Sequence, residues 1–163
     1  MDVLDRMLGH DAWATGLVLE QSSGLSDEQL VQPFDIGLGN LRETVTHLVY
    51  VIEFWTSNIE QRPIDLEWAA RPDITVLTRL HDRFHARFAA AARAARDESR
   101  LDELFTDVNG YPQSIGATVV HLLYHTAIHR SEAQHMLRRL GVELQLDGDP
   151  QEWEYGMRER GLI

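Results

Sequence analysis

Cysteine is absent from the 163 residues of the chain. Without cysteine the protein cannot form a disulfide, hold zinc on thiolates or attack a substrate with a sulfur atom of its own. A disulfide-stapled scaffold and a cysteine enzyme are therefore both excluded. Any sulfur chemistry would need a thiol from outside the chain.

Basic side chains are few. The chain has 15 Lys and Arg residues against 26 Asp and Glu residues, which gives a formal net charge of −11 at pH 7. A field of this sign repels phosphate backbones and anionic membrane surfaces. We therefore expect neither nucleic acid nor a membrane among the partners of the protein.

Long apolar runs are missing as well. No segment approaches the roughly 18 apolar residues that a membrane span needs, and the chain opens with the acidic Asp2 and Asp5 rather than with a signal-peptide core. These features predict a cytoplasmic location. The apolar content of 44%, with 4 Trp, 4 Tyr and 5 Phe, is enough to fill one interior. We expect a single domain over residues 1–163.

Apolar residues recur at intervals of three and four along most of the chain, which is the period of amphipathic helices. Capping and stop signals bound four long helices, expected at residues 2–22, 40–60, 73–96 and 115–140, and a short terminal helix after Asp149. The stretch 24–39 carries turn residues and forms a long connection, and we find no convincing strand. Four long helices with one or two long connections predict an all-α fold, a four-helix bundle.

Histidine is frequent, with eight in the chain, and several are four residues apart. Residues at this spacing lie on one helix face, about 6 Å apart at Cβ, so two imidazoles can converge on one metal ion. His125 and His129 meet this condition, and so do His121 and His125. Each step of four turns the face by about 40°, so all three cannot comfortably reach one ion. We prefer His125 and His129, which follow an inward seam with Leu122 and Met136, while His121 stays open as a replacement or an addition.

A third ligand should come from another helix, since a catalytic ion wants three protein ligands and one open position. His47 stands midway along the first half of the expected helix 40–60, between apolar residues. A bare imidazole is costly to bury in such a place. His47 is therefore the natural third candidate.

Spacing alone leaves the metal site undecided. A pair of histidines four apart is more often coincidence or solvated surface than a ligand set, and an isolated His47 is more often a core histidine. A second pair, His81 and His85, stands among charged residues, so we expect it mainly at the surface. His10 and His135 have no partner on a matching face, and we expect them at the surface too.

Three segments of the chain, taken in order, resemble the DinB/YfiT-like family of metal-dependent enzymes. The sequence His-Asp-Ala-Trp-Ala at 10–14 resembles the opening tryptophan helix of that family. Residues 41–47, with Glu53 and Trp55, resemble its first ligand helix. The sequence His-Thr-Ala-Ile-His-Arg at 125–130 resembles its closing motif. The resemblance spans nearly the whole chain and implies a four-helix bundle. It carries the three metal-binding histidines of the family over to His47, His125 and His129.

The chain departs from the family pattern directly after the closing motif. The family commonly continues with glycine and glutamine, whereas Ser131 and Glu132 stand here. The departure leaves the three histidines intact. A substrate role of these two positions therefore does not carry over from the family.

The resemblance also implies an activity. Family members of known activity resemble transferases that use a low-molecular-weight thiol such as bacillithiol, mycothiol or glutathione, and a related branch isomerises maleylpyruvate with mycothiol. For this chain the implied function is a thiol S-transferase in stress or detoxification metabolism, acting on an electrophilic small molecule. The implied cofactor is a divalent metal ion, zinc or nickel first, with iron, manganese and copper also suited to imidazole ligands. A protein without cysteine would then borrow the thiol that it uses.

Two other functions stay open at the level of the sequence. The site would be a metal-dependent hydrolase if it activated water, with Glu53 or Glu132 as the general base. The bundle would be a metal-binding stress protein without catalysis if nothing turned over. An apolar helix face on a small bundle also favours a homodimer.

Overall fold

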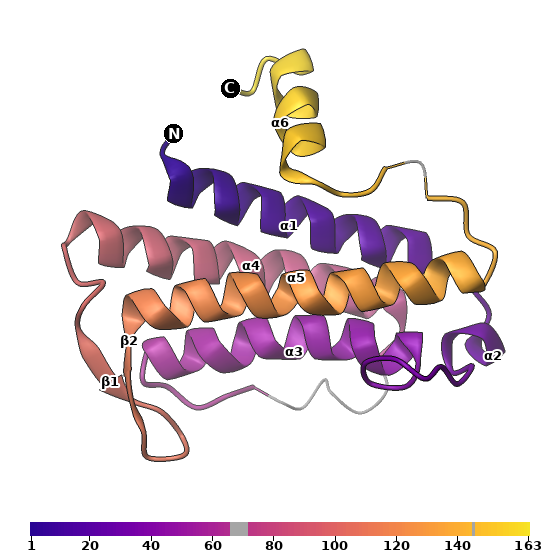
Figure 1. Ribbon diagram of the computed structural model, residues 1–163. Coiled ribbons are helices and arrows are strands. Elements are labelled where there is room, and N and C mark those ends of the chain that lie inside the picture. The colour runs from indigo at the N-terminus through magenta and orange to yellow at the C-terminus, as the bar shows by residue number, and fades with distance from the viewer. Residues whose placement is uncertain (66–71, 145) are drawn as a thin grey trace.

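The computed structural model of the protein describes residues 1–65, 72–144 and 146–163. Four long helices account for most of them, together with two short helices and a two-stranded hairpin (Figure 1). In chain order the elements are α1 (Val3–Ser22), α2 (Asp27–Leu30), α3 (Leu41–Ile59), α4 (Ile74–Asp97), β1 (Leu104–Thr106), β2 (Pro112–Ser114), α5 (Ile115–Arg139) and α6 (Pro150–Glu159).

The long helices begin where the capping signals predict. Asp73 and Ser114 each accept a hydrogen bond from a backbone N–H three residues on, at the starts of α4 and α5. Asp149 caps α6 in the same way, with Glu152 bonding back to complete a capping box. Asn40 caps α3 by accepting from the backbone of Glu43, but the structure shows no return bond from the Glu43 side chain. Such caps satisfy backbone donors that the first helical turn leaves free.

The four long helices form one bundle. α1 and α3 each pack against both α4 and α5, so the order around the bundle is α1, α4, α3, α5 (Figure 1). Every long helix contributes fully buried apolar side chains to the interior, among them Leu19, Ile52, Phe88, Leu122 and Met136. Burying a side chain of this size contributes roughly 1.5–3 kcal/mol. The packing places α3 beside α5, the two helices that carry the three candidate ligands.

A short hairpin precedes α5, and the expectation of no strand is wrong at this point. β1 pairs with β2 in antiparallel register, with Leu104 opposite Ser114. The turn between them is held by the buried carboxylate of Asp107, which accepts hydrogen bonds from the backbone N–H groups of Asn109 and Tyr111 at 2.9 Å. Each strand has only three residues, all exposed or partly buried, so no apolar alternation marks it in the sequence.

The terminal helix α6 lies across α1, as expected of a helix that closes over the bundle (Figure 1). Trp153 is buried against Gly9, where an added Cβ would come within 2.5 Å of the indole ring. His10 Nε2 lies 2.8 Å from the carbonyl oxygen of Gly148, just before α6. Glycine at position 9 thus allows Trp153 to pack closely against α1.

Among the described residues, none of the helices combines the length and the apolar character needed to cross a bilayer.

Candidate metal centre

Three histidines from two helices meet at one point of the α3–α5 interface. His47 Nε2 lies 3.0 Å from His125 Nε2, which in turn lies 3.1 Å from His129 Nε2. One ligand nitrogen from each of the three lies within 4.8 Å of the others, and all three residues are partly buried. The structure thus brings together the three histidines that the sequence analysis selected. Their binding of a metal stays a prediction.

The spacing of the three nitrogen atoms fits a metal ion. Two imidazole nitrogens at 2.0–2.1 Å from a tetrahedral zinc ion are separated by about 3.3 Å, close to the two distances observed. All three rings present the same atom, Nε2, which leaves Nδ1 free for another partner. Burial, followed by the nearby His129 and His125, lowers the pKa of His47 to about 4. The His47 imidazole is therefore neutral at pH 7, the form that binds metals.

A carboxylate supports the third histidine from behind. Glu132 Oε2 lies 2.7 Å from Nδ1 of His129, which precedes Glu132 by three residues on α5. Gly37 lies against this carboxylate with φ +53°, and a Cβ there would overlap the Glu132 side chain. A carboxylate on the far nitrogen orients a ligating imidazole and raises its basicity. Glu132 is one of the two candidates for a general base, and the structure makes it a partner of His129 through a contact that the i,i+3 spacing indicates.

His121 lies outside the three-histidine group. It is exposed, with its ring centroid 5.2 Å from that of Trp55 and 5.4 Å from that of His125. Among the described residues, the group that could hold a metal ion consists of His47, His125 and His129. The rotation of the helix over four residues explains why one member of the series is left aside.

The second histidine pair is buried, so its expected place at the surface is wrong. His81 is 2% exposed and His85 is 4% exposed. The charged neighbours from which we expected a surface position lie on the outer side of α4. His81 lies on the inner side of the helix, together with the buried Leu77, Phe84 and Phe88. His85 Nε2 lies 3.1 Å from Asp11 Oδ2, while no hydrogen-bond partner is found for the buried His81 Nε2.

Of His135 and His10, both expected at the surface, only His135 is fully at the surface. His135 is exposed, and His10 is partly buried through its contact with the segment before α6. Neither lies in the three-histidine group.

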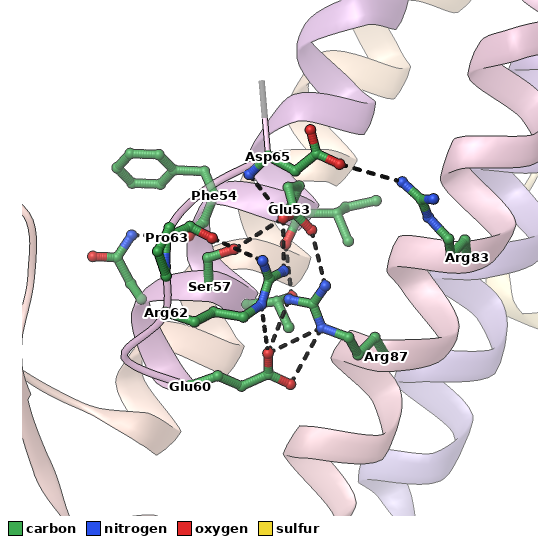
Figure 2. A network of polar contacts seen from close by, with 12 residues as sticks. Glu53, Phe54, Ser57, Glu60, Arg62, Pro63, Asp65, Arg83 and Arg87 are labelled. Atoms are coloured by element: carbon green, nitrogen blue, oxygen red, sulfur yellow. Dashed lines mark hydrogen bonds and ion pairs between the residues drawn. The ribbon is translucent and has the colours of Figure 1, made fainter. Parts of the chain in front are cut away.

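Glu53, on α3, is paired with two arginines rather than with any of the three histidines. Its carboxylate is fully buried and bonds to Arg62 at 2.6 Å and to Arg87 at 3.2 Å (Figure 2). Ser57, one turn later on α3, donates a further hydrogen bond at 3.1 Å. The network ties the segment after α3 to α4. A buried carboxylate paired with two arginines is typical of a structural ion pair, and these contacts do not favour Glu53 as a general base.

A hollow opens beside His47. It has a volume of about 320 Å³ and is lined by Leu38, Glu43, Thr46, His47 and Tyr50. This volume is at the lower end of the range for small-molecule sites. The hollow thus leaves room for a small molecule beside His47, the member of the three-histidine group that lines it.

The fold and the site together define a class: a four-helix bundle with a histidine cluster between two neighbouring helices. The DinB family model matches residues 1–155, and the chain therefore belongs to the DinB family. The resemblance found in the sequence is confirmed. No curated protein matches the chain significantly.

Two solved structures share the architecture. A DinB-like protein from Bacillus cereus ATCC 10987 superposes with a TM-score of 0.68 at 19% identity, over 84% of this chain and 90% of that one. YfiT from Bacillus subtilis is described as a probable metal-dependent hydrolase with an unusual four-helix bundle topology. It superposes with a TM-score of 0.65 at 17% identity, over 88% of this chain and 91% of that one. The predicted DinB/YfiT-like bundle is confirmed by these neighbours.

Proposed function

We propose that the protein is a metal-dependent enzyme that transfers a low-molecular-weight thiol to an electrophilic small molecule. The observation that carries the proposal is the convergence of three Nε2 atoms, on His47, His125 and His129, beside a hollow of about 320 Å³. Membership of the DinB family adds to it. The lack of cysteine means that the thiol has to be supplied as a cosubstrate.

The residues present suit a divalent ion and a nucleophile. Such an ion on three neutral imidazoles keeps its positive charge and lowers the pKa of a bound thiol or water toward neutrality. His47, His125 and His129 would hold the ion, and Glu132 would fix the orientation of His129. Zinc and nickel are the first choices, with iron, manganese and copper next, because imidazole accepts all of them. The proposal has the protein working in the cytoplasm, as a homodimer, in stress or detoxification metabolism.

A metal-dependent hydrolase is the second candidate. It is favoured by the fold shared with YfiT, whose description is that of a probable hydrolase, at 17% identity. A hydrolase needs a base for the attacking water. With Glu53 held by arginines, two carboxylates are available for that role. One oxygen of Glu132 contacts His129, and Glu43 lines the hollow beside His47.

Two substrate panels separate the candidates. The metal-loaded protein is assayed with bacillithiol, mycothiol, glutathione and coenzyme A, each with a chlorinated aromatic compound or an epoxide, and in parallel with esters and amides. We expect conjugate formation with at least one thiol. His125→Ala should abolish it, because one of the three nitrogens is lost. His121→Ala is the matched control, a histidine one turn away and outside the group, and should retain the activity.

Each result has a distinct meaning. Equal conjugation by wild type and His125→Ala with every thiol would overturn the transferase proposal. Hydrolysis of an ester or amide that depends on His125 would establish the hydrolase instead. No turnover in either panel, with a higher melting temperature on adding metal, would establish a metal-binding protein without catalysis.

A further inference from the structure

A buried carboxylate on α1 contacts the helix that carries two of the three histidines. Asp11 is fully buried. Its Oδ1 accepts a hydrogen bond from the Thr126 hydroxyl at 2.5 Å and another from the Arg130 guanidinium, and its Oδ2 lies 3.1 Å from His85 Nε2. Burial opposes ionisation, but the hydrogen bond with His85 and the charge of Arg130 outweigh it and lower the pKa of Asp11 to about 2. The carboxylate is therefore charged at neutral pH.

Both partners of Asp11 on α5 directly follow a candidate ligand in the sequence. Thr126 comes after His125, and Arg130 comes after His129. Successive residues are turned by about 100° around a helix. The two histidines can therefore face α3 while the residues that follow them face α1. α5 packs against both of these helices. Asp11 thus holds two successive turns of α5, at the positions next to the ligands.

Rotation of α5 about its own axis is the movement that these contacts restrain. An atom about 6 Å from a helix axis moves by about 1 Å when the helix rotates by about 10°. Metal–nitrogen distances, in contrast, hold within roughly 0.2 Å. Because His47 is on α3, a rotation of α5 would shift the nitrogens of His125 and His129 together relative to that of His47.

We propose that Asp11 is a positioning residue of the metal centre. By holding Thr126 and Arg130, it fixes the rotation of α5 and therefore the places of His125 and His129. The proposal rests on the metal-binding part of the proposed function. It predicts that Asp11, which contacts none of the three histidines through any observed hydrogen bond, sets their affinity for the ion.

The chain contains a matched control for this proposal. Glu53 is also a fully buried carboxylate with arginine partners, but those partners, Arg62 and Arg87, come from the segment after α3 and from α4 (Figure 2). Asp11→Asn and Glu53→Gln both neutralise a buried carboxylate without changing its size much. A general loss of stability should therefore appear in both variants, whereas a loss of ligand placement should appear only in Asp11→Asn.

The experiment measures metal affinity rather than turnover. Zinc(II) is titrated into the full chain against a chromophoric chelator, and cobalt(II) is titrated by its visible absorption, with melting temperatures recorded for the metal-free proteins. We expect Asp11→Asn to bind zinc about tenfold more weakly, the smaller of the effects known for outer partners of ligands, and to change the cobalt spectrum. Glu53→Gln should lower the melting temperature and keep the wild-type affinity and spectrum.

Two milder variants test the same contacts if Asp11→Asn fails to fold. Thr126→Val removes one hydroxyl and should weaken zinc binding by a smaller factor, while Arg130→Lys should retain more affinity than Arg130→Met because it keeps the charge beside Asp11. Wild-type affinity in the folded Asp11→Asn and Thr126→Val variants, or an equal loss in Glu53→Gln, would overturn the proposal. A wild-type protein that binds neither metal would instead overturn the metal-binding basis of the proposed function.

Discussion

At the scale of single residues, the eight histidines illustrate how surroundings decide what a side chain does. His125 and His129, at a spacing of four, turn their Nε2 atoms toward His47, whereas His81 and His85, at the same spacing, are buried inside the bundle. The spacing is visible in the sequence, but the helix that faces each pair is not. The seam of apolar neighbours that favours the first pair is local information and can be predicted from the sequence.

The buried contacts of Asp11 show what local patterns leave out. Asp11 meets His85 and Arg130 across 74 and 119 residues of sequence. No spacing rule reaches over such distances, so the network follows only from the packing of α1 on α4 and α5. Glu132 is the opposite case, since it contacts His129 only three residues away in the sequence, a spacing at which side chains on a helix meet.

Burial of His81 gives the first prediction in this part, on stability. Burial and the neighbouring His85 lower the pKa of His81 to about 4, against a smaller opposing effect of Asp82 and Asp11. The folded state therefore disfavours the proton that the unfolded chain binds below about pH 6.5. The stability that the folded state gains from keeping His81 neutral is fully present above that pH. It is lost as the pH falls toward 4, by up to about 3 kcal/mol in the free energy of unfolding.

We accordingly expect His81→Leu to flatten the fall in the free energy of unfolding between pH 6.5 and pH 4. The substitution also removes the buried Nε2 atom for which no partner is found. Urea denaturation at a series of pH values measures the effect, with His135→Leu as the exposed control. An unchanged pH dependence in His81→Leu would contradict the burial argument.

At the scale of elements, the helices were easier to predict than the connections between them. Caps such as Asn40, Asp73 and Ser114 act within one turn, so the sequence indicates where α3, α4 and α5 begin. The hairpin of β1 and β2 depends on a pairing between two three-residue strands, and neither has a pattern of its own. Elements that are defined by pairing with another segment, rather than by a pattern of their own, are the ones that the sequence does not reveal.

The terminal helix α6 is an element with one main support, and it gives the second prediction. It packs on α1 through the buried Trp153, while Arg6 and Glu154 add a partly exposed ion pair at 3.4 Å. Such an ion pair contributes at most about 1 kcal/mol, whereas truncating a buried tryptophan to alanine costs roughly 3–5 kcal/mol. Trp153→Ala should therefore detach α6 and leave the bundle folded.

Limited proteolysis tests this expectation. Trp153→Ala should be cleaved within residues 146–163 much faster than wild type, with the remaining bundle resistant and its zinc affinity unchanged, because the three histidines are on α3 and α5. Tyr155→Ala is the matched control, since Tyr155 is on the same helix and 67% exposed. Equal cleavage of Trp153→Ala and wild type would show that other contacts hold α6.

At the scale of the whole molecule, the core and the candidate metal centre are separate structures. The interior is filled by apolar side chains from all four long helices, including Phe84, Phe88, Leu122 and Met136. The three histidines lie at the α3–α5 interface and remain partly exposed. A small zinc finger, in contrast, depends on its ion for folding because it has little other core.

Metal removal should therefore weaken the protein without unfolding it. An ion that binds the folded state alone adds stability in proportion to the logarithm of its concentration over its dissociation constant, about 4.1 kcal/mol at a thousandfold excess. We expect a chelator to lower the melting temperature while the far-ultraviolet circular dichroism at 25 °C stays that of a helical protein. In His47→Ala, with one ligand gone, the chelator should cause a much smaller shift, whereas His121→Ala should respond like wild type. Loss of helical signal on chelation of the wild type would contradict the separation of core and metal centre, and would assign the ion a structural role.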